Sequence, residues 1–225
     1  MFDTEGALDV YVFCFSEHER NNTDGILAMW RGYGSHGNGA ALIFDAGVRL
    51  DTPDEPAIPF LMLPVKYGTH EQREKILDDI LNRWSEIAHS VTLPDELLYV
   101  AAYSFFHALK IFALTTKHDG FREEKEWRLI YIPEIDSKKL LMPHLSYAIG
   151  VRGVEPKLKF NLKAVADRLK LAEQLKDTLV QIILGPTVSS HLSVLATKRM
   201  LEKINKPELC DRVVASSIPL RPKND

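Results

Sequence analysis

Short apolar runs alternate along the chain with polar, glycine-rich or proline-rich stretches, and most of these runs are too short to form helices. Residues 10–15 form a nearly continuous run of apolar, β-branched and aromatic side chains, which is typical of a buried strand. Gly185 and Pro186 end a similar run at 179–184. The same reasoning predicts strands at 40–45, at 60–67 with an interruption at Pro64, and at a sheet edge at 213–220.

Longer segments show helical periodicity. Apolar side chains recur at helical spacing through residues 76–88 with charged residues between them, so one face of this helix meets a core. Residues 95–114 are apolar on nearly every face and follow Pro94, a residue suited to the first helical position, which predicts a buried central helix. Shorter or weaker helical patterns cover 26–31, the basic segment 157–175 and the amphipathic segment 192–204.

From residue 122 to residue 132 the pattern changes to a period of two, which predicts a strand with one polar face. Glu124, Glu126 and Arg128 lie on one side of it, and Trp127 and Leu129 lie on the other. Helices and strands follow one another in mixed order without regular βαβ repetition. This order predicts an α+β fold with a mixed, mostly antiparallel sheet, a buried central helix and flanking amphipathic helices.

The composition is that of a folded protein with a sizeable core, since 45% of the 225 residues are hydrophobic and 26% are charged. We therefore expect a single domain over residues 1–225. The formal net charge of -3 provides no global positive field for duplex nucleic acid or an anionic membrane. No apolar run approaches the ~20 residues that span a bilayer, and the first residues lack a secretory signal, so we expect a cytoplasmic protein without a membrane partner.

The cysteines and histidines predict no metal site. Cys14 and Cys210 lie far apart in or beside apolar stretches, which indicates reduced core residues rather than a disulfide. His36, His118 and His191 lack the spacing of metal ligands. We expect no metal cofactor.

The densest group of ionisable residues lies between 117 and 128 and divides into two candidate sites. Glu124, Glu126 and Arg128 place two carboxylates and a guanidinium in a row. Such a row could hold a sugar hydroxyl and stabilise a developing cation, as glycosyl transfer from a nicotinamide dinucleotide requires. Glu126 is the central carboxylate of this first set.

The second set, Glu123 and Lys125, has the Glu-x-Lys spacing that in metal-dependent nucleases places a magnesium ligand beside a lysine. A nuclease site also needs an upstream acidic residue, for which Asp45 is the candidate. A purely structural alternative explains both sets, because charges on a solvated sheet face commonly pair across strands.

A second candidate region combines Ser16 with Trp30, Tyr33 and the glycine-rich loop 34–39. Glycines let a backbone approach a ligand closely, and Trp30 or Tyr33 could stack on a base or a nicotinamide ring. The alternative is a glycine-rich connection beside an aromatic core cluster, since no phosphate-binding fingerprint is present.

Several motifs occur together and in order, and in combination they are specific. The opening pattern covers 12–17, 28–34, 37–39 and 44–45, and it is followed by matches at 65–67, 117–118, 121, 124–129, 183–186 and 217–221. With these motifs the chain resembles the bacterial domain-of-unknown-function family 2971 over nearly its whole length.

The resemblance implies a distant similarity to ADP-ribosyltransferases. In those enzymes a Glu-x-Glu pair follows a mobile loop, and its second glutamate holds the nicotinamide ribose. Glu124 and Glu126, after the loop 117–122, match that pattern, and Ser16 stands where a supporting hydroxyl is common. Members of the family usually begin with a further segment that would precede residue 1, so the resemblance also implies a chain that lacks this segment.

The leading hypothesis is an ADP-ribosyltransferase-like or NAD-processing domain. Glu126 would stabilise the ribosyl cation, Glu124 would orient the acceptor, and Arg128 would support a carboxylate or phosphate. Ser16, Trp30 and Tyr33 would bind the nucleotide, for which NAD is the candidate substrate, whereas the sequence identifies neither a protein nor a nucleic acid as the acceptor. A non-catalytic binding module and a magnesium-dependent nuclease stay open as alternatives, and a role in phage defence would suit the resemblance.

Overall fold

The computed structural model describes residues 9–45, 59–90, 92, 94–151, 153–159, 178–186 and 190–219. The chain divides into two compact units, each formed by two separate parts of the sequence. Unit 1 comprises Met1–Glu17 and Phe60–Tyr131, and unit 2 comprises His18–Pro59 and Ile132–Asp225. Both units contain helices and strands, and most strand pairs are antiparallel, which confirms the α+β prediction. The single-domain expectation stays a prediction.

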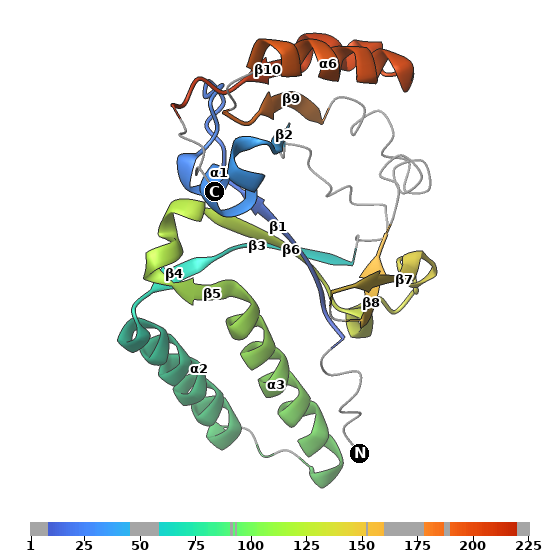
Figure 1. The fold of residues 1–225 in the computed structure, drawn as a ribbon. Coiled ribbons are helices and arrows are strands. Elements are labelled where there is room, and N and C mark those ends of the chain that lie inside the picture. The colour runs from blue at the N-terminus through green and yellow to red at the C-terminus, as the bar shows by residue number, and fades with distance from the viewer. Residues whose placement is uncertain are drawn as a thin grey trace. The chain divides into compact units, whose positions relative to one another are not determined.

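Unit 1 is built around β6 (Glu126–Tyr131), which pairs antiparallel with β1 (Tyr11–Ser16) on one side and β3 (Phe60–Pro64) on the other (Figure 1). Ser16 is paired with Glu126, and Cys14 with Arg128. Since strand side chains alternate between faces, these four residues lie on one face of the sheet. The strand predicted at 60–67 is interrupted as expected, because Pro64 ends β3 and β4 (Lys66–Gly68) begins after Val65.

The strand predicted from residue 122 begins four residues later. Residues Asp119–Glu124 form the 3-10 helix η4, and Lys125 has a left-handed backbone with φ of 43° that redirects the chain into β6. The alternation of faces therefore holds only from Glu126 onward. The segment 117–122 is also not a loop, because its first two residues belong to β5 (Thr116–His118), which pairs in parallel with β4.

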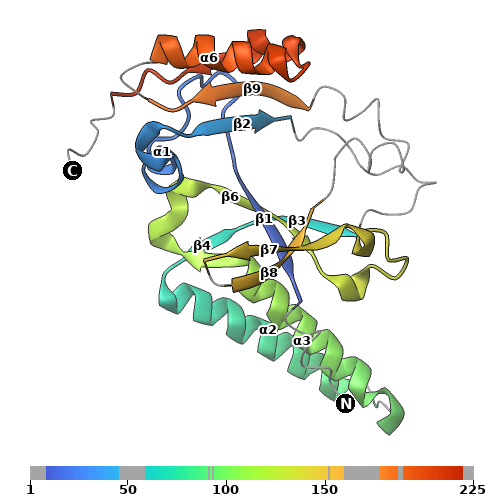
Figure 2. The ribbon, with the colours of Figure 1, turned by 45° about the vertical axis from the view of Figure 1, so that its right-hand side comes forward.

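The prediction of a buried central helix was wrong. Helix α3 (Leu98–Thr115), preceded by the 3-10 turn η3 (Asp95–Leu97), packs against α2 (His70–Ser90), and Figure 2 shows the two helices running side by side. The rings of Trp84 and Phe105 join them, with centroids 4.8 Å apart. Thr115 alone is buried among the described residues of both helices. A helix that is apolar all round needs covering on several sides, and within unit 1 this pairing covers one side of α3.

The expectation that no apolar run approaches the length of a membrane span was also wrong. The continuous helical segment Asp95–Thr115 is long and apolar enough to cross a membrane by length and composition. Ser104, His107 and Lys110 interrupt its apolar sequence, so that counting uninterrupted apolar residues missed it.

Unit 2 contains a second three-stranded sheet. In it β9 (Leu179–Leu184) lies between antiparallel β2 (Ala40–Phe44) and parallel β10 (Val213–Ala215). Helix α6 (Ser190–Lys203) contributes Leu201 to a core with Ile182, Leu184 and Val213. The remaining elements are α1 (Leu27–Tyr33), the hairpin of β7 (Leu145–Gly150) and β8 (Gly153–Leu158), and the 3-10 helices η2 (Ser35–Gly37), η5 (Pro133–Ile135), η6 (Met142–His144) and η7 (Pro207–Arg212).

The predicted strands at 10–15, 40–45 and 179–184 and the helices at 26–31 and 192–204 are confirmed to within two residues at their ends, and the helix predicted at 76–88 is confirmed but begins six residues earlier, at His70. The final strand is shorter than predicted, and the sequence missed the β7–β8 hairpin. The basic segment 157–175 begins in β8, and its residues from 160 onward lie outside the described part of the chain.

Candidate functional site

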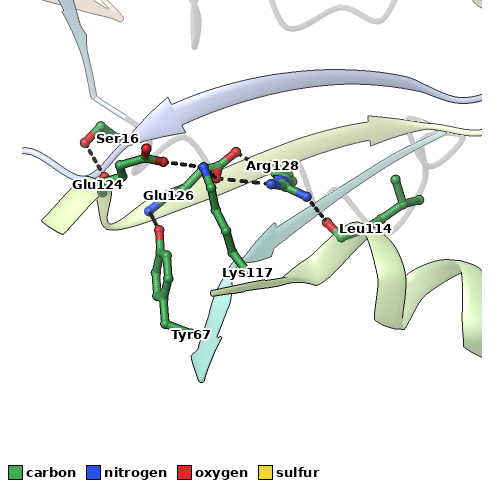
Figure 3. Close-up of polar contacts among 7 residues, drawn as sticks. All are labelled: Ser16, Tyr67, Leu114, Lys117, Glu124, Glu126 and Arg128. Atoms are coloured by element: carbon green, nitrogen blue, oxygen red, sulfur yellow. Dashed lines mark hydrogen bonds and ion pairs between the residues drawn. The ribbon is translucent and has the colours of Figure 1, made fainter. Parts of the chain in front are cut away.

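Four charged side chains of unit 1 meet at the face of the β1–β6–β3 sheet that carries Glu126 (Figure 3). Lys117 donates from Nζ to Oε2 of Glu126 at 3.0 Å and to Oε2 of Glu124 at 2.5 Å. Arg128 donates to both oxygens of Glu126, at 2.8 Å from Nε and 3.2 Å from a terminal nitrogen. Two carboxylates and two cations therefore form one connected network, which we call the Glu126 cluster.

Backbone contacts hold this cluster at the end of β1. Ser16 donates its hydroxyl to the carbonyl oxygen of Glu124 at 2.5 Å, and the amide of Glu17 donates to the carbonyl of Lys125 at 2.9 Å. These bonds fasten the left-handed turn between η4 and β6 to the neighbouring strand. Ser16 thus contacts the backbone of Glu124, and its role as a supporting hydroxyl stays a prediction.

Two further residues connect the cluster to β4 and α3. The hydroxyl oxygen of Tyr67 accepts a hydrogen bond from the amide of Glu126 at 2.8 Å. Arg128 donates from Nη1 to the carbonyl oxygen of Leu114 at 2.8 Å, in the last turn of α3, where helix carbonyls lack intrahelical partners. Arg128 therefore links β6 to the end of the helical pair, and it also compensates the charge of Glu126.

Glu126 is held as a carboxylate in a nearly water-free position, since 6% of the residue is exposed. Burial alone would raise the pKa of Glu126, but hydrogen bonds from Arg128, Cys14 and Lys117 outweigh burial and lower the pKa to about 2. The same contacts keep the cations charged. Burial lowers the pKa of Lys117 and its bonds to Glu124 and Glu126 raise it, with a net increase, and the bond to Glu126 raises the pKa of Arg128.

Cys14 is an unexpected member of this face. It is an exposed free thiol rather than the core residue predicted, because it lies on the same side of β1 as Ser16, opposite Arg128. Partial burial of the thiol and its hydrogen bond to Glu126 raise the pKa of Cys14 to about 11. The thiol is therefore protonated at neutral pH and donates to the carboxylate.

The second charged set does not join this cluster. Glu123 and Lys125 are exposed, whereas Glu124 and Glu126 are the inward pair. Asp45 lies in unit 2 and forms an ion pair with Arg20 at 3.7 Å. In the part of the chain that the structure describes, no three histidine, cysteine, aspartate or glutamate side chains are grouped as metal ligands.

Trp30 and Tyr33 belong to unit 2, and Ser16 belongs to unit 1. Trp30 is buried at 4% exposure and donates its indole N–H to the carbonyl of Asp24 at 2.8 Å. Gly34 packs on it so closely that an added Cβ would lie 2.7 Å from the Trp30 carbonyl oxygen. The glycine there is explained by this packing, and Tyr33 is 68% exposed.

The sequence pattern placed Glu124, Glu126 and Arg128 together correctly but missed their partners. Lys117 lies nine residues before Glu126, on a different strand, and only the β4–β5 pair brings its amine to the two carboxylates. Its ammonium also lies 4.8 Å from the centroid of the Phe121 ring. Cys14 had a usable signal, since it lies two residues before Ser16 on a predicted strand and must share its face.

Comparisons with known proteins address the family and not the reaction. Residues 29–129 match the model of the family described as "Protein of unknown function (DUF2971)". The matched segment includes Tyr67, Lys117 and the Glu124–Arg128 motif. No curated protein and no solved structure matches the chain. The match over residues 29–129 supports the resemblance to this family, and it does not extend to ADP-ribosyltransferases.

Proposed function

We propose that the Glu126 cluster is the reaction site of an ADP-ribosyltransferase-like, NAD-processing protein. The observation that carries this proposal is the state of Glu126, a carboxylate held ionised at 6% exposure beside a second glutamate and a serine hydroxyl. Cleavage of the nicotinamide–ribose bond develops positive charge on the ribose. A fixed carboxylate in a dry environment stabilises such charge far better than one in water, because no solvent screens it.

The chemistry assigns a role to each group. The bond between the ribose and the nicotinamide nitrogen breaks, its electron pair leaves with neutral nicotinamide, and Glu126 stabilises the ribosyl cation. An acceptor oxygen or nitrogen then bonds to the ribose and gives up its proton, for which Glu124 is the nearby carboxylate. Lys117 or Arg128 can turn to the phosphates of the dinucleotide, since guanidinium and ammonium groups bind phosphate readily.

A non-catalytic binding module is the second candidate, and one observation favours it. Lys117 and Arg128 already compensate both carboxylates, as in a structural network that fastens β1, β5, β6 and α3 together. In that case Tyr33 and other exposed groups would contact the ligand, and the cluster would only hold the fold. The two candidates differ in whether the parent chain releases nicotinamide.

The decisive experiment compares the parent chain with Glu126→Gln and with Glu123→Gln as matched control. Both variants remove one glutamate charge, but Glu123 is exposed and outside the cluster. NAD binding is measured by calorimetry and turnover by nicotinamide release, with water, protein and nucleic acid offered as acceptors. We expect turnover to fall at least ~100-fold in Glu126→Gln and to persist in Glu123→Gln.

Thermal melting of all three chains shows whether a lost activity reflects lost folding. If Glu126→Gln melts near the parent temperature and retains full turnover, the catalytic role is wrong. If the parent neither binds nor cleaves NAD, the binding module is the better account. Cytoplasmic location and a contribution to phage defence belong to the same proposal, and NAD depletion in cells that express the chain would support them.

A further inference from the structure

Helix α3 carries an exposed aromatic stripe along the side that α2 leaves uncovered. Tyr99, Tyr103 and Phe106 are separated by four and three residues, which places them on one line of a helix. Their exposed fractions are 67%, 41% and 39%. Phe105, on another side of the helix, is the residue that contacts Trp84 of α2.

The stripe has the spacing of a coiled-coil seam. Starting at Glu96, the positions that follow at intervals of three and four residues are Tyr99, Tyr103, Phe106, Lys110 and Ala113. Alternating intervals of three and four keep side chains on one seam when two helices pack at a small angle. The three aromatic residues of this seam are exposed in the single chain, and contiguous exposed apolar side chains mark interaction sites.

Opposite charges lie at the two ends of the seam. Asp95 and Glu96 are exposed before its first aromatic residue, and Lys110 lies near its other end, 5.4 Å from the centroid of the Phe106 ring. A parallel pair of identical helices would bring like charges together. An antiparallel pair instead sets the Lys110 end of each helix against the Asp95–Glu96 end of the other, so the surface is complementary to itself.

We propose that α3 packs antiparallel against α3 of a second copy of this chain, about a twofold axis near Tyr103 and Phe106. The two α2–α3 pairs then close into a four-helix bundle with the aromatic stripe in its interior. A two-helix pair cannot cover a helix that is apolar all round, whereas a bundle of four does so. A twofold interface uses the same patch on both copies, as the charge pattern requires.

The test is sedimentation velocity of the full chain from about 1 to 100 μM, the range in which interfaces of modest size dissociate. We expect a dimer that becomes monomeric in Tyr103→Glu and in Phe106→Glu. The control is Tyr147→Glu, which places the same charge on a tyrosine of β7 in unit 2 that is 67% exposed and outside the stripe, and it should leave the dimer intact. Circular dichroism of each variant separates a lost interface from lost folding.

Charge reversal tests the antiparallel arrangement itself. Glu96→Lys and Lys110→Glu should each raise the dissociation constant of the dimer about 5- to 10-fold. The double variant should have a dissociation constant within about 3-fold of the parent, because the two charges attract again with exchanged signs. A double reversal weaker than either single variant overturns the proposal. A parent chain that is monomeric at every concentration also overturns it. The same holds for a parent chain that does not dimerise but floats with phosphatidylcholine–phosphatidylglycerol vesicles in a manner that depends on Tyr103 and Phe106.

Discussion

Folded proteins usually expose charged side chains and bury apolar ones, and the Glu126 cluster and helix α3 each do the reverse: the cluster buries charges, and the helix exposes apolar side chains. In the cluster, two carboxylates and two cations are withdrawn from water and satisfy one another. In the helix, aromatic and aliphatic side chains face solvent, and Thr115 is its only buried residue. Folded proteins accept the cost of buried charge and of exposed apolar patches mainly where these serve a purpose. These departures are the reason for the two proposals, a reaction site at the cluster and a partner surface on the helix.

The largest effect expected in the cluster is that of Arg128→Ala. This change leaves Glu126 without its bidentate partner in a nearly water-free position and removes the link to the Leu114 carbonyl. Loss of one partner of a buried pair costs about 3–5 kcal/mol in free energy of unfolding, measurable by urea denaturation. Arg122→Ala is the control, because its ion pair with Asp119 is exposed and should contribute at most about 1 kcal/mol. Equal losses in the two variants would show that the cluster is no different from a surface pair.

Acid should weaken unit 1 through the same carboxylate. The pKa of Glu126 lies at about 2 in the folded chain, below its ordinary value of 4.5. Because the pKa is lower in the folded chain than in the unfolded chain, the ionised Glu126 contributes its full stabilisation above about pH 5. This contribution is lost as the pH falls toward 2. The shift corresponds to about 3 kcal/mol. Urea unfolding between pH 7 and 3 measures this loss. The free energy of unfolding should fall with pH in the parent and in Glu123→Gln, and it should fall less steeply in Glu126→Gln. The same pH dependence in all three chains would contradict the assignment.

A smaller effect is expected where α2 and α3 meet. Trp84→Ala removes the ring that contacts Phe105, and because Trp84 is only half-buried the loss should be about 2 kcal/mol rather than the larger cost of a fully buried aromatic residue. Ile87→Ala, on an exposed part of α2, should change the free energy of unfolding by less than about 0.5 kcal/mol. Thermal melts at low protein concentration, where the chain is monomeric, measure the contribution of the Trp84–Phe105 contact. A loss at Ile87 as large as that at Trp84 would mean that the exposed side of α2 is covered.

The smallest change in free energy of unfolding is expected from the hydrogen bond that joins the end of β1 to the backbone of Glu124. Ser16→Ala removes the hydroxyl that donates to the Glu124 carbonyl while leaving all four charged side chains in place. One such hydrogen bond contributes about 1 kcal/mol. If Ser16 also supports a reacting nucleotide, turnover should fall by more than this stability change explains, and Ser16→Thr should restore part of it. Proportional loss of stability and turnover would assign Ser16 to the fold alone.

Local sequence pattern was sufficient for elements whose form depends on neighbours along the chain. The run that became β1, the run that became β9 and the helical periodicity of α2 and α6 were each readable, because strand and helix periods are local properties. The alternation that placed Glu126 and Arg128 on one face was readable for the same reason. The η4 turn was not, since the left-handed backbone at Lys125 ends an alternation that the residues themselves would have continued.

By itself, the sequence determined the α+β class, most of the strands and helices, and a Glu-x-Glu-x-Arg segment with one polar face. Only the tertiary structure decided that Lys117, Cys14 and the Leu114 carbonyl complete that face, because β5, β1 and α3 bring groups from distant parts of the chain to it. It also decided that α3 is exposed rather than central. Periodicity shows which sides of a helix can be buried, but burial depends on which elements the fold sets against them.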